Sequence, residues 1–138
     1  MDDQTLIKQL NARSPGFIPM LGGRIVAINR EEQSCTFEFS IGTDFCHSID
    51  VVQGGFVTSM LDAAMSHAVF AIAENIVSAS SLAINTSYLE VTRAGRLRAV
   101  GKVVKSSHKT VFLEGQLYNE EGRLTATTNA VAKLTRKS

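Results

Sequence analysis

Asp62 is the only formally charged residue between Val51 and Ala73, a largely apolar stretch of the 138-residue chain. Burying a carboxylate in a core helix is costly unless it is paired, hydrogen-bonded or used in chemistry. A carboxylate that is held in place by hydrogen bonds can act as a general base or as a nucleophile. Perturbed carboxylates also occur in structural networks, so spacing alone leaves a functional acid and a satisfied core acid equally open.

A pair of glycines, Gly54 and Gly55, lies upstream, with Gly54 eight residues before Asp62. Backbone N–H groups at the start of a helix are unpaired and bind developing negative charge. A glycine pair alone could equally be a hinge or a close-packing point. Its position two helical turns before the lone acid, with Ser66 one turn after that acid, outlines an active site.

The spacing of the histidines and cysteines along the sequence does not match that of a metal site. His47 precedes the helix, where a catalytic histidine and a surface histidine are both open. His67 has apolar neighbours and is expected to be a core histidine, whereas His108 is expected in an exposed turn. Cys35 and Cys46 match no metal-binding spacing, and no His-x-x-x-His occurs. We expect neither a metal nor a cofactor.

Hydrophobic periodicity predicts the elements that would position these residues. A short amphipathic helix presents Leu6, Ile7 and Leu10 on one face, and a loop follows through Pro19 to Gly23. The long helix is predicted over 54–73, and Gly101 suggests a bulge in one strand. The predicted strands cover 24–30, 35–41, 82–91, 97–105, 110–118 and 123–134.

This order of elements predicts an α+β fold in which a curved antiparallel sheet wraps around one long central helix. A helix that is apolar almost all round must be covered on most sides, and a curled sheet is the economical cover. No alternation of strands and helices is present, which disfavours a parallel sheet. The length suits one domain over 1–138. Open sheet edges make a homodimer plausible.

Composition excludes several classes of function. The net charge of +1 and the seven Phe and two Tyr without Trp argue against nucleic-acid binding. Polar residues within the apolar helix argue against a membrane span, since Asp alone costs about 2.5–3.5 kcal/mol at a membrane centre. The N-terminus has no secretory pattern, and two reduced cysteines fit a cytoplasmic protein.

The run from His47 to Asp62, HSIDVVQGGFVTSMLD, resembles the signature of hotdog-fold thioesterases of the phenylacetate-pathway type. The family pattern is Asn-x-x-Gly-x-x-His-Gly-Gly, followed by a helix with an acid eight residues after the first glycine of the pair. Gly54 and Asp62 match that spacing. The resemblance extends from about Pro19 to Leu134 and implies the helix-in-sheet fold derived above.

The resemblance also implies roles for individual residues. Gly54 would supply the N–H that polarises a thioester carbonyl, next to Gly55. Asp62 would be the nucleophile or general base, acting across a dimer interface. Ser66 and Ser81 match positions where relatives carry a hydroxyl near the hydrolytic water.

The segment from Ser106 to Lys109 resembles the turn that meets coenzyme A phosphates. Ser107, His108 and Lys109 are its candidate contacts, and Lys109 is favoured among them. The glycine usual in that turn is absent.

Three positions depart from the family pattern. Gln53 stands where His is usual, and it can still donate and accept hydrogen bonds to hold the loop or touch the carbonyl. His47 replaces an amide, which keeps a donor and adds a titrating group. Asp50 replaces a glycine, which changes the loop backbone or places a second acid near the pocket.

The expected function is therefore hydrolysis of a short-chain, medium-chain or aryl acyl-CoA by a homodimer or homotetramer. Two alternatives are a non-catalytic acyl-CoA-binding hotdog module and a hotdog hydratase or dehydratase that would use His47 and Asp50. A purely structural oligomerisation domain would leave the acid in the helix unexplained.

Overall fold

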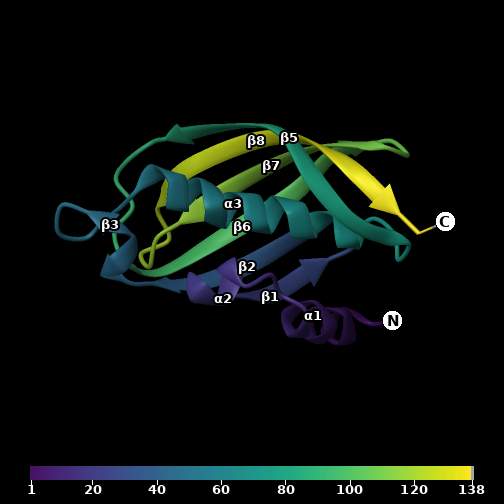
Figure 1. The fold of residues 1–138 in the computed structure, drawn as a ribbon, viewed down its shortest axis with the longest axis horizontal. Helices are drawn as coiled ribbons and strands as arrows, with labels where there is room; N and C mark the ends of the chain where they lie inside the picture. The colour runs from purple at the N-terminus through teal and green to yellow at the C-terminus, as the bar shows by residue number, and fades with distance from the viewer. Residues whose placement is uncertain (138) are drawn as a thin grey trace.

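The computed structural model describes residues 1–137 as one curved antiparallel sheet with a long helix lying in its concave face (Figure 1). The sheet has six strands in the order β1-β2-β6-β7-β8-β5. A two-stranded hairpin, β3-β4, precedes the long helix. The elements in chain order are α1 (Asp3–Ala12), α2 (Phe17–Met20), β1 (Gly23–Asn29), β2 (Ser34–Ile41), the 3-10 turn η1 (Thr43–Phe45), β3 (Cys46–His47), β4 (Val51–Val52), α3 (Gly54–Ala68), the 3-10 turn η2 (Val69–Ala71), β5 (Ile76–Tyr88), β6 (Gly95–Ser106), β7 (Thr110–Tyr118) and β8 (Leu124–Arg136).

Helix α3 is the centre of the fold. Its apolar residues are buried against the inward side chains of the strands, and Met60, Leu61, Ala64 and Met65 have no exposed surface. Phe37 and Phe39 of β2 stack on one another with ring centroids 5.5 Å apart and complete that core. The sheet wrapped around one long helix confirms the α+β hotdog fold that the sequence predicts.

Gly101 has a different role from the bulge suggested by the sequence. The irregularity in the β6–β7 pairing lies between Val103 and Lys105 instead. A Cβ atom at Gly101 would lie 2.3 Å from the carbonyl carbon of Ala64. Glycine is needed there because the backbone of α3 packs directly onto the backbone of β6.

The N-terminal helix is confirmed and is tied to the edge of the sheet. The Asp2 side chain caps it by accepting from the Thr5 N–H at 2.7 Å. The Asn11 amide exchanges two hydrogen bonds with the backbone of Ile25 in β1, at 2.8 and 3.0 Å. The loop predicted through Pro19 is wrong in part, because Phe17–Met20 forms one helical turn that buries Ile18.

Two predicted elements have different boundaries in the structure. The α-helical part of α3 ends at Ala68, and η2 continues it only to Ala71, short of residue 73. Strand β5 begins at Ile76 rather than residue 82 and ends at Tyr88 rather than residue 91. Its early start follows from pairing with β8, in which Ile76 lies opposite Arg136. The serine-rich start of β5 carries little strand signal of its own.

Strand β5 forms one edge of the sheet, along the upper rim in Figure 1. Most of its residues are exposed, including Leu82 at 65% and Tyr88 at 54%. Within residues 1–137, no helix is both long and apolar enough to cross a membrane.

Candidate active site

Asp62 lies on the side of α3 that faces β5, and two serines hold its carboxylate. Ser66, one turn later on the helix, donates to Asp62 Oδ1 at 3.2 Å. Ser81 of β5 donates to the same oxygen at 2.9 Å. Ser66 was predicted to lie near this acid and Ser81 near the hydrolytic water, and the structure brings all three side chains together. The other carboxylate oxygen, Oδ2, accepts no hydrogen bond from the described residues and is left for a water or a substrate.

A cavity of about 700 Å³ opens beside Asp62, between α1, the second half of α3 and the start of β5. Asp62, Ser66 and His67 supply polar groups to its wall, Arg13, Arg30 and Glu74 supply charged ones, and Phe70 lines it as well. Leu6 and Leu10 of α1 form the opposite side. A cleft of this size and composition accommodates a small organic ligand with an apolar body.

The start of α3 presents one free backbone donor. Gln53 is the N-cap residue, and its side-chain Oε1 accepts from the Gly55 N–H at 2.8 Å. Gln53 therefore holds the loop, which is one of the two roles foreseen for it. The Gly54 N–H has no partner in the part of the chain that the structure describes. With Gly55 occupied by the cap, Gly54 is the donor available to an oxyanion at this terminus.

A set of hydroxyl groups that sequence reasoning did not identify holds this helix start against β5. The Tyr88 hydroxyl donates to the Gly54 carbonyl at 2.8 Å and lies 2.9 Å from Thr58 Oγ1. Thr58 in turn donates to Thr86 Oγ1 at 2.9 Å. The sequence could have indicated Thr58, because Thr58 shares a helix face with Asp62. The contribution of Tyr88 depends on the strand register and has no sequence signal.

A bulge in β5 makes both sets of contacts reachable from one strand. The pairing with β8 shifts between Ser81 and Ala83, so that Leu82 is an extra residue. Ser81 before the bulge and Thr86 and Tyr88 after it consequently face the same helix. The bulge fixes which strand residues meet the two ends of the site.

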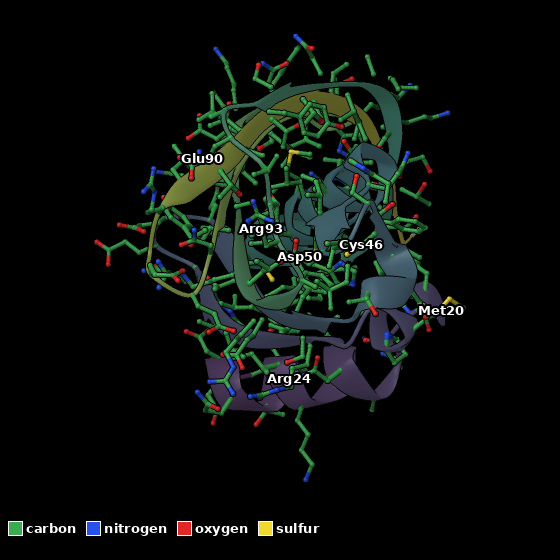
Figure 2. All side chains as sticks on the ribbon, turned by 90° about the vertical axis from the view of Figure 1, so that its left-hand side faces the viewer. Met20, Arg24, Cys46, Asp50, Glu90 and Arg93 are labelled. Carbon is green, nitrogen blue, oxygen red and sulfur yellow. The ribbon has the colours of Figure 1, made fainter. Side chains whose placement is uncertain are left out.

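His47 and Asp50 do not join Asp62 in the structure. The His47 ring is exposed in the β3–β4 hairpin and lies 3.2 Å from the Ser48 hydroxyl. Asp50 accepts from Arg93 Nη1 at 2.6 Å, and Figure 2 shows the two side chains meeting near Cys46. Asp50 is engaged by this ion pair and does not line the cavity beside Asp62 of its own chain.

Residues 50–126, more than half of the chain, match the family model of the Thioesterase superfamily. The chain belongs to the thioesterase superfamily. Its class, thioester hydrolase, is the one predicted from the sequence. No curated protein matches this thioesterase.

Solved structures agree with that assignment. A phenylacetic acid degradation-related protein of Ralstonia eutropha is 29% identical, covers 91% of this chain and 96% of its own, and superimposes with a TM-score of 0.82. The Escherichia coli PaaI protein from the phenylacetic acid degradation operon is 16% identical over 97% of this chain and 93% of its own, with a TM-score of 0.82. A Haemophilus influenzae thioesterase is 17% identical over 99% of this chain and 92% of its own, with a TM-score of 0.81. The predicted resemblance to the phenylacetate-type thioesterases is confirmed.

The β6–β7 turn of this thioesterase, with Ser107, His108 and Lys109, lies away from Asp62. A row of residues paired across the strands links the turn to Ser81. Ser81 pairs with Ala132, Ala132 with Val111, and Val111 with Ser106. Three strand spacings of about 4.8 Å separate the turn from Ser81. Ser107 closes the turn through Thr110, and the side chains of His108 and Lys109 are exposed.

Proposed function

We propose that the chain hydrolyses an acyl-CoA thioester to a free acid and coenzyme A, with Asp62 as the catalytic carboxylate. The observation that carries this proposal is the pair of hydrogen bonds from Ser66 and Ser81 to one oxygen of Asp62, at the wall of an acyl-sized cavity. The two serines fix the carboxylate and leave its second oxygen for reaction. Positioning of this kind is what a general base or a nucleophile requires.

The oxyanion donor and the carboxylate must come from two subunits. Gly54 and Asp62 are eight residues apart on one helix, a rise of about 12 Å. One thioester carbonyl cannot contact both groups of the same helix. In a two-fold dimer with antiparallel α3 helices, the Gly54 N–H of each subunit meets the Asp62 carboxylate of the partner. This arrangement centres the dimer axis near Thr58, midway between the two residues.

The exposed edge of β5 supports such a homodimer. This strand has thirteen residues, carries no charged side chain and leaves Val77, Leu82 and Tyr88 exposed. A long uncharged edge strand pairs readily with another chain. A second copy that paired along β5 would extend the sheet and cover both α3 helices. Val104 and Phe112, exposed on the outer face of the sheet, offer a surface on which two dimers would form a homotetramer.

Two routes lead from this geometry to hydrolysis. In both, the Gly54 N–H and the positive end of the α3 dipole stabilise the charge on the carbonyl oxygen. As a general base, Asp62 takes a proton from water, which attacks the acyl carbon and expels the coenzyme A thiolate. As a nucleophile, Asp62 attacks the acyl carbon itself, the C–S bond breaks, and water then hydrolyses the mixed anhydride and restores the carboxylate. In the first route Asp62 then passes this proton to the departing thiolate. In the second, the thiolate takes up the proton that hydrolysis of the anhydride releases, so both routes yield the free acid and the coenzyme A thiol.

Coenzyme A would extend from the acyl site toward the β6–β7 turn. Lys109 offers a cation for a phosphate, while Ser107 and His108 offer further polar groups. The free Cys35 and Cys46 fit a reducing compartment, and we place the enzyme in the cytoplasm.

Thiol release from short-chain, medium-chain and aryl acyl-CoAs tests the proposal. Asp62→Asn keeps the shape of the side chain and an oxygen that accepts from both serines, but removes the charge. We expect a loss of at least about a hundredfold in kcat/KM, while the exposed acid variant Asp44→Asn retains activity. Binding of acyl-CoA with no turnover by the wild type would instead favour the non-catalytic module.

A further inference from the structure

His67 has one ring nitrogen that the fold leaves without a partner. Its Nδ1 lies 2.8 Å from the Ala63 carbonyl oxygen, one turn earlier on α3. A carbonyl oxygen only accepts, so the Nδ1 atom carries the hydrogen. Nε2 is then a bare acceptor when the ring is neutral. Residues 1–137 offer it no hydrogen-bond partner.

The surroundings of the ring fix its position and keep it neutral. Phe37 and Phe70 pack edge-on against it, with ring centroids 5.2 and 5.7 Å away. Burial lowers the pKa of His67, and the Ala63 carbonyl and the Asp62 carboxylate only partly oppose that effect. The Nε2 atom is nevertheless not sealed in the core, because His67 lines the same cavity as Asp62. A rigid, accessible acceptor in the wall of a cavity is suited to recognising a ligand donor.

Resting on the proposed function, we propose that His67 Nε2 is a specificity determinant that accepts a hydrogen bond from a hydroxyl group far along the acyl chain. Asp62 and His67 are five residues apart on α3, a rise of about 7.5 Å. A hydroxyl on the carbon beta to the thioester cannot span that distance when the carbonyl is at Asp62. A hydroxyl near the end of a medium-length chain can.

The physical reason for selectivity is the cost of an unpaired acceptor. When an unsubstituted acyl chain fills the cavity, it displaces water from Nε2 and gives no hydrogen bond in return. A hydroxylated chain pays no such cost. Sites built to hydrogen-bond a hydroxyl discriminate against analogues that lack it.

The first test compares kcat/KM for octanoyl-CoA, ω-hydroxyoctanoyl-CoA and β-hydroxyoctanoyl-CoA. We expect the wild type to prefer the ω-hydroxy thioester over octanoyl-CoA by about tenfold and to give the β-hydroxy isomer no such advantage. His67→Phe keeps an aromatic ring between Phe37 and Phe70 but removes the acceptor, so the ratio should fall to about one. Asp44→Asn, the exposed control used above, should keep the wild-type ratio. The assignment would be overturned if the wild type had the same kcat/KM for octanoyl-CoA and the ω-hydroxy thioester, or if it preferred both hydroxy isomers equally. An unchanged ratio in His67→Phe would overturn it as well.

A second measurement does not depend on catalysis or on the variant folding. Nitrogen NMR of the wild-type histidines reports the tautomer and the environment of each ring nitrogen. We expect a protonated Nδ1 in His67, and a larger shift of Nε2 with ω-hydroxyoctanoate than with octanoate. Equal shifts, or none, would overturn the proposal for His67. Absence of thioester hydrolysis together with the selective NMR shift would instead reject the catalytic function and retain the binding role.

Discussion

Ser81 Oγ donates to Asp62 Oδ1 at 2.9 Å and joins the edge strand β5 to the central helix α3. The contact exists because Ser81 directly precedes the bulge at Leu82 and its side chain faces inward, toward α3. Ser66 binds the same oxygen from within the helix. Together they orient a carboxylate that no cation among the described residues pairs with.

Removing the strand contact should weaken catalysis without abolishing it. Ser81→Ala deletes one hydrogen bond to a charged group and leaves the bond from Ser66. We expect kcat to fall about tenfold, with KM changing less, because hydrogen bonds to charged groups contribute about 1.5–3 kcal/mol. Ser80→Ala is the matched control, since Ser80 pairs with Lys133 and is exposed on the outer face. Equal kinetics of the two variants would mean that Ser81 does not position Asp62.

Two substitutions at Gly54 separate the loss of its N–H from the addition of a side chain. Proline is well tolerated as the first residue of a helix, and Gln53 before it already has the extended backbone that proline requires, with φ −63° and ψ 138°. Gly54→Ala keeps the N–H and adds a Cβ atom 3.1 Å from the Tyr88 hydroxyl. We expect Gly54→Pro to lose about a hundredfold in kcat relative to Gly54→Ala. Similar rates in the two variants would argue against this N–H as the oxyanion donor.

The stability of the protein should depend on the protonation of His67. Burial, the largest effect, lowers its pKa below the ordinary value of 6.5. The unfolded chain therefore binds more protons than the folded one between that lowered pKa and 6.5. The stabilising contribution is complete above 6.5 and is lost as the pH falls through this window, by about 1.4 kcal/mol per unit of pKa difference.

Chemical denaturation at several pH values checks this dependence. The free energy of unfolding of the wild type should decrease on acidification below 6.5 more steeply than that of His67→Phe. Parallel curves for the two proteins would show that another group is responsible.

The two thiols should differ in reactivity. Burial raises the pKa of Cys35, which has no exposed surface, and also raises the pKa of Cys46, with a further contribution from the Asp50 carboxylate. We expect an alkylating reagent at mildly alkaline pH to modify Cys46 slowly and Cys35 only after unfolding. Peptide mass spectrometry resolves the two sites. Modification of Cys35 at the same rate as Cys46 in the native protein would contradict the burial of β2.

Sequence patterns were sufficient for the elements with a strong periodicity. Cys35, Phe37 and Phe39 alternate with polar residues and form the buried face of β2, as predicted. The apolar helix and its acid were equally clear, and the spacing of Ser66 from Asp62 follows from the helical repeat alone.

The rest depends on contacts between elements. The first residues of β5 are strand only because β8 extends beside them, and the Leu82 bulge reverses which residues face α3. Tyr88 could not be linked to Gly54 without that register. The ion pair of Asp50 could not be predicted for a similar reason, since its partner Arg93 is distant in sequence and close only in the fold.

Mixing two inactive variants tests the shared site most directly. In a mixed dimer of Asp62→Ala and Gly54→Pro subunits, one site contains both altered residues and the other contains an intact Gly54 and an intact Asp62. Refolding the two variants together in equal amounts should restore thiol release to about a quarter of the wild-type rate, since half of the dimers are mixed and half of their sites are intact. Release no higher than that of the separate variants, with mixed dimers demonstrated by mass spectrometry, would contradict an active site formed by Gly54 of one subunit and Asp62 of the other.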